Sequence, residues 1–147
     1  METTYKSGRP IQILLVEDNI ADASLVLKYL KGCSVPNQVT VVRDGEEALD
    51  FLKKRWLYAD LKAAPRPDLI LLDLKMPKIS GLDVLRWIRL QPDLRVLRII
   101  VFSSSNYPSD INSAHALRIS AYLVKPGRLD EWVALVDALK TSWLGGS

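Results

Sequence analysis

The sequence has very little of the chemistry that builds cross-links and zinc sites. Cys33 is its single cysteine and His115 its single histidine. One cysteine cannot form an intrachain disulfide, and a zinc site needs several Cys or His ligands. These absences exclude a disulfide-stabilised secreted domain and a zinc module, and they favour a cytoplasmic chain. We interpret Cys33 as a packing residue and His115 as an exposed helix residue.

Long hydrophobic runs are also absent. The first apolar run, residues 13–16, ends at Glu17 and Asp18. No stretch approaches the roughly 18 uninterrupted apolar residues of a membrane span. We therefore expect neither membrane insertion nor export.

Neither sign of charge dominates. Lys and Arg number 20 and Asp and Glu 17, which gives a net charge of +3 and a pI near 9.0. The basic residues are scattered among acidic ones, and no basic run with interleaved aromatics or recognition helix is evident. We therefore expect no nucleic-acid partner, and salt-dependent retention on random DNA would contradict this.

The chain of 147 residues leaves room for one domain, because a typical domain has about 100 to 200 residues. A hydrophobic content of 48% and a charged content of 25% are typical of a folded globular protein. We expect an N-terminal tail over residues 1–10 and one domain over residues 11–147.

Short apolar runs alternate with longer segments of helical period, which is typical of parallel βαβ units. We therefore predict an α/β fold. The predicted strands span residues 11–16, 38–43, 68–72, 97–102 and 121–124.

Helical periodicity and capping residues predict the helices between these strands. The first helix ends at Gly32, Asp44 and Glu47 form a capping box for the second, and Ser80 caps the third. The fourth, over residues 108–117, has the weakest apolar stripe.

The predicted C-terminal helix carries more apolar residues than one sheet face can cover. Its helical period comprises Leu129, Trp132, Val133, Val136, Leu139, Lys140 and Trp143, and Gly145-Gly146 ends the helix. Leu135 and Ala138 lie off that stripe, so this helix could offer a surface to a partner.

Three carboxylates follow the ends of predicted strands: Glu17 and Asp18 after the first, and Asp73 after the third. The carboxyl ends of parallel strands share one edge of the sheet, where ligands bind. Crowded carboxylates repel one another unless a cation or a chemical role accounts for them. Mg²⁺ fits best, because it binds one or two carboxylates and keeps several waters.

A cation and a hydroxyl are predicted at the same edge. Lys125 closes the fifth strand, and Pro126 restricts it to an extended backbone. Ser103 lies at the end of the fourth strand. An acid cluster, an amine and a hydroxyl together suit a tetrahedral phosphoryl group.

The motifs at these strand ends resemble the receiver domain of two-component response regulators. They comprise Val16-Glu17-Asp18-Asn19, Leu71-Leu72-Asp73-Leu74-Lys75-Met76-Pro77 with Gly81, Ser103, and Tyr122-Leu123-Val124-Lys125-Pro126. The resemblance covers residues from about 11 to 143 and implies a flavodoxin-like, doubly wound sheet of order 2-1-3-4-5 with five helices. It also implies that no output domain follows.

The resemblance assigns chemical roles. Asp73 would attack the phosphohistidine of a sensor histidine kinase and become an aspartyl phosphate. Glu17, Asp18 and the Lys75 carbonyl would help Asp73 to hold Mg²⁺, partly through water. Lys125 would pair with the phosphoryl oxygens, and the resemblance therefore implies a phosphoacceptor rather than an enzyme.

The resemblance also implies a conformational switch. Ser103 takes the place of the family's switch Ser or Thr and would move to bond the new phosphate. Tyr122 would rotate inward behind it. The added charge of about −1.5 to −2 favours the switched state.

Further features resemble the single-domain receivers that serve bacterial and cyanobacterial phytochromes. They are the long stretch over residues 55–67, the Pro108 start of the fourth helix, and Trp143 near the end. This similarity implies a phytochrome-type kinase as partner and a homodimer formed through the C-terminal helices. Gly127 departs from the family, in which an aromatic residue commonly follows the Lys-Pro pair.

Two other functions stay open. A receiver fold used only for docking would accept no phosphate, although all five site residues are present. An Asp-nucleophile phosphatase needs a second aspartate two residues after the first as general acid, and Lys75 occupies that position.

Overall fold

The computed structural model describes residues 10–32, 36–53 and 67–143, with side chains described as far as residue 139. Cys33, most of the predicted N-terminal tail, most of the irregular stretch over residues 55–67 and the Gly145-Gly146 helix end lie outside the described residues. Among the helices that are described, none has the length and apolar content that crossing a bilayer requires.

A parallel five-stranded sheet forms the centre of the fold, in the order β2-β1-β3-β4-β5. The strands are β1 (Ile11–Val16), β2 (Asn37–Val42), β3 (Leu69–Leu72), β4 (Arg98–Ser103) and β5 (Ala121–Val124). The predicted fold class and strand order are therefore confirmed.

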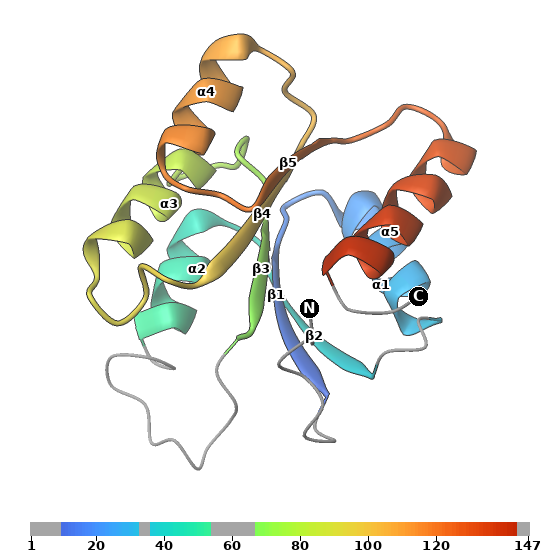
Figure 1. Ribbon diagram of the computed structural model, residues 1–147, viewed down its shortest axis with the longest axis horizontal. Helices are drawn as coiled ribbons and strands as arrows, with labels where there is room; N and C mark the ends of the chain where they lie inside the picture. Colours follow the sequence, from blue (N-terminus) through green and yellow to red (C-terminus); the bar gives the residue numbers. More distant parts are fainter. Residues whose placement is uncertain (1–9, 33–35, 54–66, 144–147) are drawn as a thin grey trace.

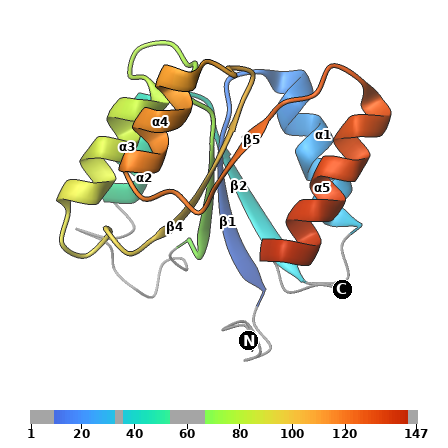
Figure 2. The same cartoon turned by 45° about the horizontal axis from the view of Figure 1, so that its top comes forward.

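Within the described residues, five helices cover the two faces of the sheet (Figures 1 and 2). They are α1 (Ile20–Lys31), α2 (Gly45–Leu52), α3 (Gly81–Leu90), α4 (Pro108–Ala116) and α5 (Leu129–Trp143). Helices α1 and α5 lie on one face, and α2, α3 and α4 lie on the other.

The core is divided by the sheet into two layers. Alternate residues of β1 point to opposite faces: Leu14 and Val16 pack with α2, α3 and α4, and Ile13 and Leu15 pack with α1 and α5. Strand β3 is buried along its whole length, as a strand covered on both faces must be. Because helices cover both faces of the sheet, the register between its parallel strands is fixed, and their carboxyl ends lie together at one edge.

The helix caps form largely as the sequence predicts. Asp44 accepts a hydrogen bond from the Glu47 amide at 2.8 Å, and Ser80 accepts one from the Asp83 amide at 3.2 Å. The Glu47 carboxylate, however, accepts from the Arg43 amide at 2.9 Å, one residue before the expected partner. The Arg43 and Glu47 amides therefore both have a side-chain acceptor.

Some predicted boundaries and faces were wrong. Strands β2 and β4 are displaced by one residue from the predicted ranges 38–43 and 97–102, because side-chain pattern identifies a buried face better than the last ladder hydrogen bond. In α5 only Trp132, Val136 and Leu139 of the described stripe are buried. Leu129 is 59% exposed and Val133 37% exposed, because they lie beside the face that packs on the sheet.

Two glycines permit close approach of backbone segments at the carboxyl edge. A Cβ on Gly45 would overlap the carbonyl oxygen of Ile79, and a Cβ on Gly81 would overlap the carbonyl oxygen of Asp73. Neither obstacle is a flexible side-chain end, so neither can move cheaply. The β3–α3 loop can therefore lie against the starts of α2 and α3 only because Gly45 and Gly81 lack a side chain.

Replacing Gly45 by Ala is expected to lower the free energy of unfolding by about 1–3 kcal/mol, because backbone must shift to admit the methyl group. Gly127 is the matched control, since a Cβ there meets no atom within 4 Å. Urea unfolding of Gly45→Ala and Gly127→Ala compares the two. Equal stability of both variants and the wild type would contradict the proposed close approach.

Candidate functional site

Three carboxylates gather at the carboxyl edge of the sheet. Glu17 follows β1 and is 3% exposed, and Asp73 follows β3 and is 4% exposed. Asp18 is exposed beside them, and one oxygen from each of the three lies within 4.8 Å of the others. The predicted acidic cluster therefore forms, with two of its members buried.

Lys125 contacts the two buried carboxylates of this cluster. Its Nζ is 2.6 Å from Glu17 Oε1, 3.0 Å from Asp22 Oδ2 and 3.3 Å from Asp73 Oδ2. The Lys125 side chain is only 7% exposed, and its amide donates to the Ser103 carbonyl at 2.8 Å. The end of β5 thus places a buried ammonium group among the carboxylates that it neutralises.

Burial and charge shift the acid–base properties of this pair. Burial raises the pKa of Glu17 to about 7, the Lys125 hydrogen bond opposes that rise, and the Asp73 charge adds to it. Burial alone would lower the pKa of Lys125, but its hydrogen bonds to Glu17 and Asp22 outweigh this, so the Lys125 pKa lies above its usual range. Lys125 is therefore a permanent cation at neutral pH.

The Asp73 carboxylate is held by both neighbouring loops. The Lys75 amide donates to Asp73 Oδ1 at 3.2 Å, while Lys125 donates to Asp73 Oδ2 at 3.3 Å. The Asp73 amide donates to the Val16 carbonyl at 3.1 Å, which ties the residue to the end of β1. These contacts orient the carboxylate toward Lys125 and the acidic cluster.

Ser103 and Tyr122 meet at the β4–α4 loop through Ser105. Ser103 is fully buried, and its Oγ accepts from the Ser105 amide at 3.2 Å. The Tyr122 hydroxyl donates to the Ser105 carbonyl at 2.8 Å. The two predicted switch residues are therefore joined by one loop residue that the sequence did not single out.

The Lys75 side chain leaves the acidic cluster and contacts the start of α4. Lys75 Nζ is 3.2 Å from Asp110 Oδ2, and the same oxygen accepts from the Ser105 hydroxyl at 2.5 Å. Hydrogen bonds from Ser105 and Lys75 lower the pKa of Asp110 below its usual range. Lys75 is thus a cation, paired with Asp110, where a phosphatase would need an acid.

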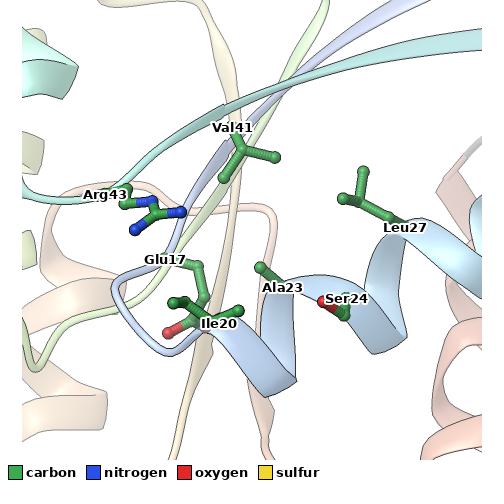
Figure 3. Close-up of a pocket in the computed structure, with 7 residues that line it drawn as sticks. All are labelled: Glu17, Ile20, Ala23, Ser24, Leu27, Val41 and Arg43. Atoms are coloured by element: carbon green, nitrogen blue, oxygen red, sulfur yellow. The ribbon is translucent and has the colours of Figure 1, made fainter.

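An open groove of about 320 Å³ runs from the cluster between α1 and β2. Figure 3 shows Arg43 and Ile20 near its Glu17 end and Leu27 at its far end. Ile20 is 62% exposed. The buried Glu17 carboxylate therefore lies next to a surface that a partner can reach.

Sequence reasoning missed Asp22, Ser105 and Asp110. Asp22 and Asp110 lie in the first turns of α1 and α4, where an acid is common because it stabilises the helix dipole. Ser105 follows two other serines. The two acids contact Lys125 and Lys75, which are far away in sequence, so local patterns do not reveal these contacts.

The donors of the cluster fit a hard divalent cation. Glu17, Asp18 and Asp73 offer oxygen atoms only, and the exposure of Asp18 leaves room for bound water. Mg²⁺ prefers such a mixture of carboxylate and water oxygens, and Mn²⁺ accepts it.

Comparison with known proteins agrees with this geometry. The family model of the response regulator receiver domain matches residues 13–137. Response regulator Rcp1 of Synechocystis sp. is 36% identical over 95% of this chain and 92% of its own length. The crystal structure of its Mn²⁺-bound form superposes with a TM-score of 0.84, over 92% of this chain and 95% of that one.

Two further solved structures are similar. The phosphorylated cyanobacterial phytochrome response regulator RcpA has 37% identity and a TM-score of 0.84, covering 92% of this chain and 95% of that one. A response regulator in red light signalling of R. palustris has 31% identity and a TM-score of 0.79, covering 93% and 96%. The fold, the residues that match the family model and these relatives show that the chain belongs to the response regulator receiver family of two-component signalling.

Proposed function

We propose that this chain is a phosphoacceptor that receives a phosphoryl group on Asp73 from a histidine kinase. The contact of Lys125 with Asp73, beside Glu17 and Asp18, supports this most strongly. A buried ammonium group next to a strand-end carboxylate stabilises the charge that develops on phosphoryl oxygens during transfer. The proposed receiver spans residues 11–147 and passes its signal on through protein contacts.

In the proposed transfer, one carboxylate oxygen of Asp73 attacks the phosphorus atom of a phosphohistidine. The new O–P bond forms as the P–N bond breaks, and the imidazole nitrogen leaves with the bonding electron pair. Lys125 keeps its proton throughout and pairs with a phosphoryl oxygen. Mg²⁺, held by Glu17, Asp18, Asp73 and the Lys75 carbonyl, would neutralise further negative charge on the phosphoryl group.

The proposed switch follows from the charge that transfer adds. A phosphoryl group brings about −1.5 to −2 charge and three acceptor oxygens. Ser103 would turn its hydroxyl from the Ser105 amide to one of these oxygens. Tyr122 would then exchange its bond to the Ser105 carbonyl for an inward position.

Mild phosphorylation of the purified protein tests the acceptor. With Mg²⁺ and acetyl phosphate, the wild type should gain one hydroxylamine-labile phosphate, and Asp73→Asn should gain none above background. Asp83→Asn is the matched control, because Asp83 is an exposed acid paired with Arg86 on α3, and it should label like the wild type. An unlabelled wild type would favour the docking-only function instead.

The kinase partner is proposed from the relatives, whose names refer to phytochrome and to red light signalling. We expect radiolabelled phosphate to pass from a phytochrome-type histidine kinase to the wild type and not to Asp73→Asn. Such kinases use ATP, so the proposal implies a cytoplasmic protein. Faster transfer from a kinase without a photoreceptor domain would contradict the phytochrome link.

Binding of Mg²⁺ should depend on pH through Glu17. Because the pKa of Glu17 is about 7, the metal-free site holds a proton below that pH and must release it to bind a cation. Mg²⁺ affinity is therefore expected to fall by up to about tenfold per pH unit as the pH drops below 7. Calorimetry between pH 5.5 and 8 measures this, with Glu17→Gln expected to bind weakly and with little pH dependence. A flat wild-type profile would contradict the proposed role.

We also propose a homodimer that uses α5 and its neighbours. Among the described side chains, four large apolar ones are exposed on or beside α4, β5 and α5: Tyr107, Val124, Leu129 and Val133, with exposures of 66%, 41%, 59% and 37%. Exposed apolar side chains that gather on adjacent elements are typical of protein interfaces. A second copy fits because a two-fold interface needs only one self-complementary patch.

Light scattering tests the dimer. The wild type should show about twice the chain mass of 16.5 kDa, and Leu129→Ser/Val133→Ser should shift the mass toward the monomer. Leu90→Ser is the matched control, because Leu90 is 78% exposed on α3, across the sheet from α5. A wild type that stays monomeric with and without acetyl phosphate would exclude the proposed dimer.

A further inference from the structure

A chain of polar contacts joins the loop after Asp73 to the start of α4. It runs from Lys75 Nζ to Asp110 Oδ2 at 3.2 Å and from that oxygen to the Ser105 hydroxyl at 2.5 Å. One carboxylate oxygen therefore connects the β3–α3 loop, the β4–α4 loop and α4. The β3–α3 loop is far from the other two segments in sequence, so the Lys75 contact links parts of the chain that only the fold brings together.

Ser105 extends the chain to both proposed switch residues. Its amide donates to Ser103 Oγ, and its carbonyl accepts from the Tyr122 hydroxyl. Ser105 is only 6% exposed, so these bonds are shielded from competing water. Whatever fixes Ser105 therefore also restrains Ser103 and Tyr122.

The two contacts of Asp110 differ in strength. Lys75 is 56% exposed, and an exposed ion pair alone contributes little to stability. The hydrogen bond from the buried Ser105 hydroxyl to a charged carboxylate is the stronger one. The Lys75 arm is therefore the one that a new charge can detach.

We propose that Asp110 is a positioning residue that holds the β4–α4 loop in the arrangement of the unphosphorylated site, and that a phosphoryl group on Asp73 competes with Asp110 for Lys75. The proposal rests on the proposed function. Lys75 is two residues from Asp73, and its amide already donates to that carboxylate. When Lys75 turns to the phosphoryl oxygens, Asp110 loses its cation, and Ser105 and the start of α4 are released.

Population shift sets the direction of the expected effect. If Asp110 favours the unphosphorylated arrangement, the fraction of molecules ready to hold a phosphoryl group is reduced, and apparent affinity for a phosphoryl mimic falls in proportion. Weakening Asp110 must then raise that affinity. A purely structural role would lower it or leave it unchanged.

Binding of beryllofluoride in the presence of Mg²⁺ measures this affinity. Asp110→Asn keeps an acceptor for Ser105 but removes the charge that attracts Lys75, so it should bind beryllofluoride about three- to tenfold more tightly than the wild type. Asp83→Asn makes the same charge change in the first turn of α3 and should bind like the wild type. Ser105→Ala removes the hydrogen bond from the Ser105 hydroxyl to Asp110 and leaves the charges of Lys75 and Asp110 in place. This variant should also bind beryllofluoride more tightly than the wild type.

A double-mutant cycle separates positioning from a general loosening of the fold. In a Lys75→Met background Asp110 has no cation to hold, so Asp110→Asn should then change the affinity less than twofold. Equal gains in both backgrounds, or no gain for Asp110→Asn over Asp83→Asn, would overturn the proposal. A wild type that binds no beryllofluoride would contradict the proposed function itself.

Discussion

The site is organised around a buried ammonium group. Lys125 Nζ contacts Glu17, Asp22 and Asp73, which come from the end of β1, the first turn of α1 and the end of β3. Two buried carboxylates so close together would be strongly destabilising without a cation, and removing one partner of such a group typically costs about 3–5 kcal/mol. The Lys125 amide is itself fixed to the end of β4. Lys125 therefore connects the ends of β1, β3 and β4 and contacts the Asp73 carboxylate directly.

Sequence reasoning located the residues of this site that follow strands. A strand end can be recognised from a short apolar run, and parallel strands must end at one edge, so the sequence pattern alone predicted that Glu17, Asp73 and Lys125 lie together. The same reasoning could not find Asp22 or Asp110, because acids in a first helical turn are common for local reasons. Their contacts depend on where each helix begins relative to the neighbouring loops, and the apolar period of a helix does not specify that position.

Packing details were also beyond the sequence. An apolar period in α5 indicated an inward stripe, yet Leu129 and Val133 are exposed, because they lie beside the face of α5 that packs into the core. The need for Gly45 arises from Ile79, which belongs to a different loop. The neighbour that restricts Gly45 lies far away in sequence, whereas a buried strand can be recognised from its own few residues.

The two lysines of the site, Lys125 and Lys75, differ in exposure and in number of carboxylate partners, and their proposed roles differ accordingly. Lys125 is 7% exposed and has three carboxylate partners, so adding a phosphoryl group gives it another anion without requiring it to leave. Lys75 is 56% exposed, and Asp110 is its one salt-bridge partner among the residues that the structure describes, so a stronger anion nearby can displace Asp110 from it. Under the proposed function, the buried lysine keeps the acceptor in place while the exposed lysine changes partner. Because its former partner lies on α4, the change in charge at Asp73 becomes a change in the restraints on that helix.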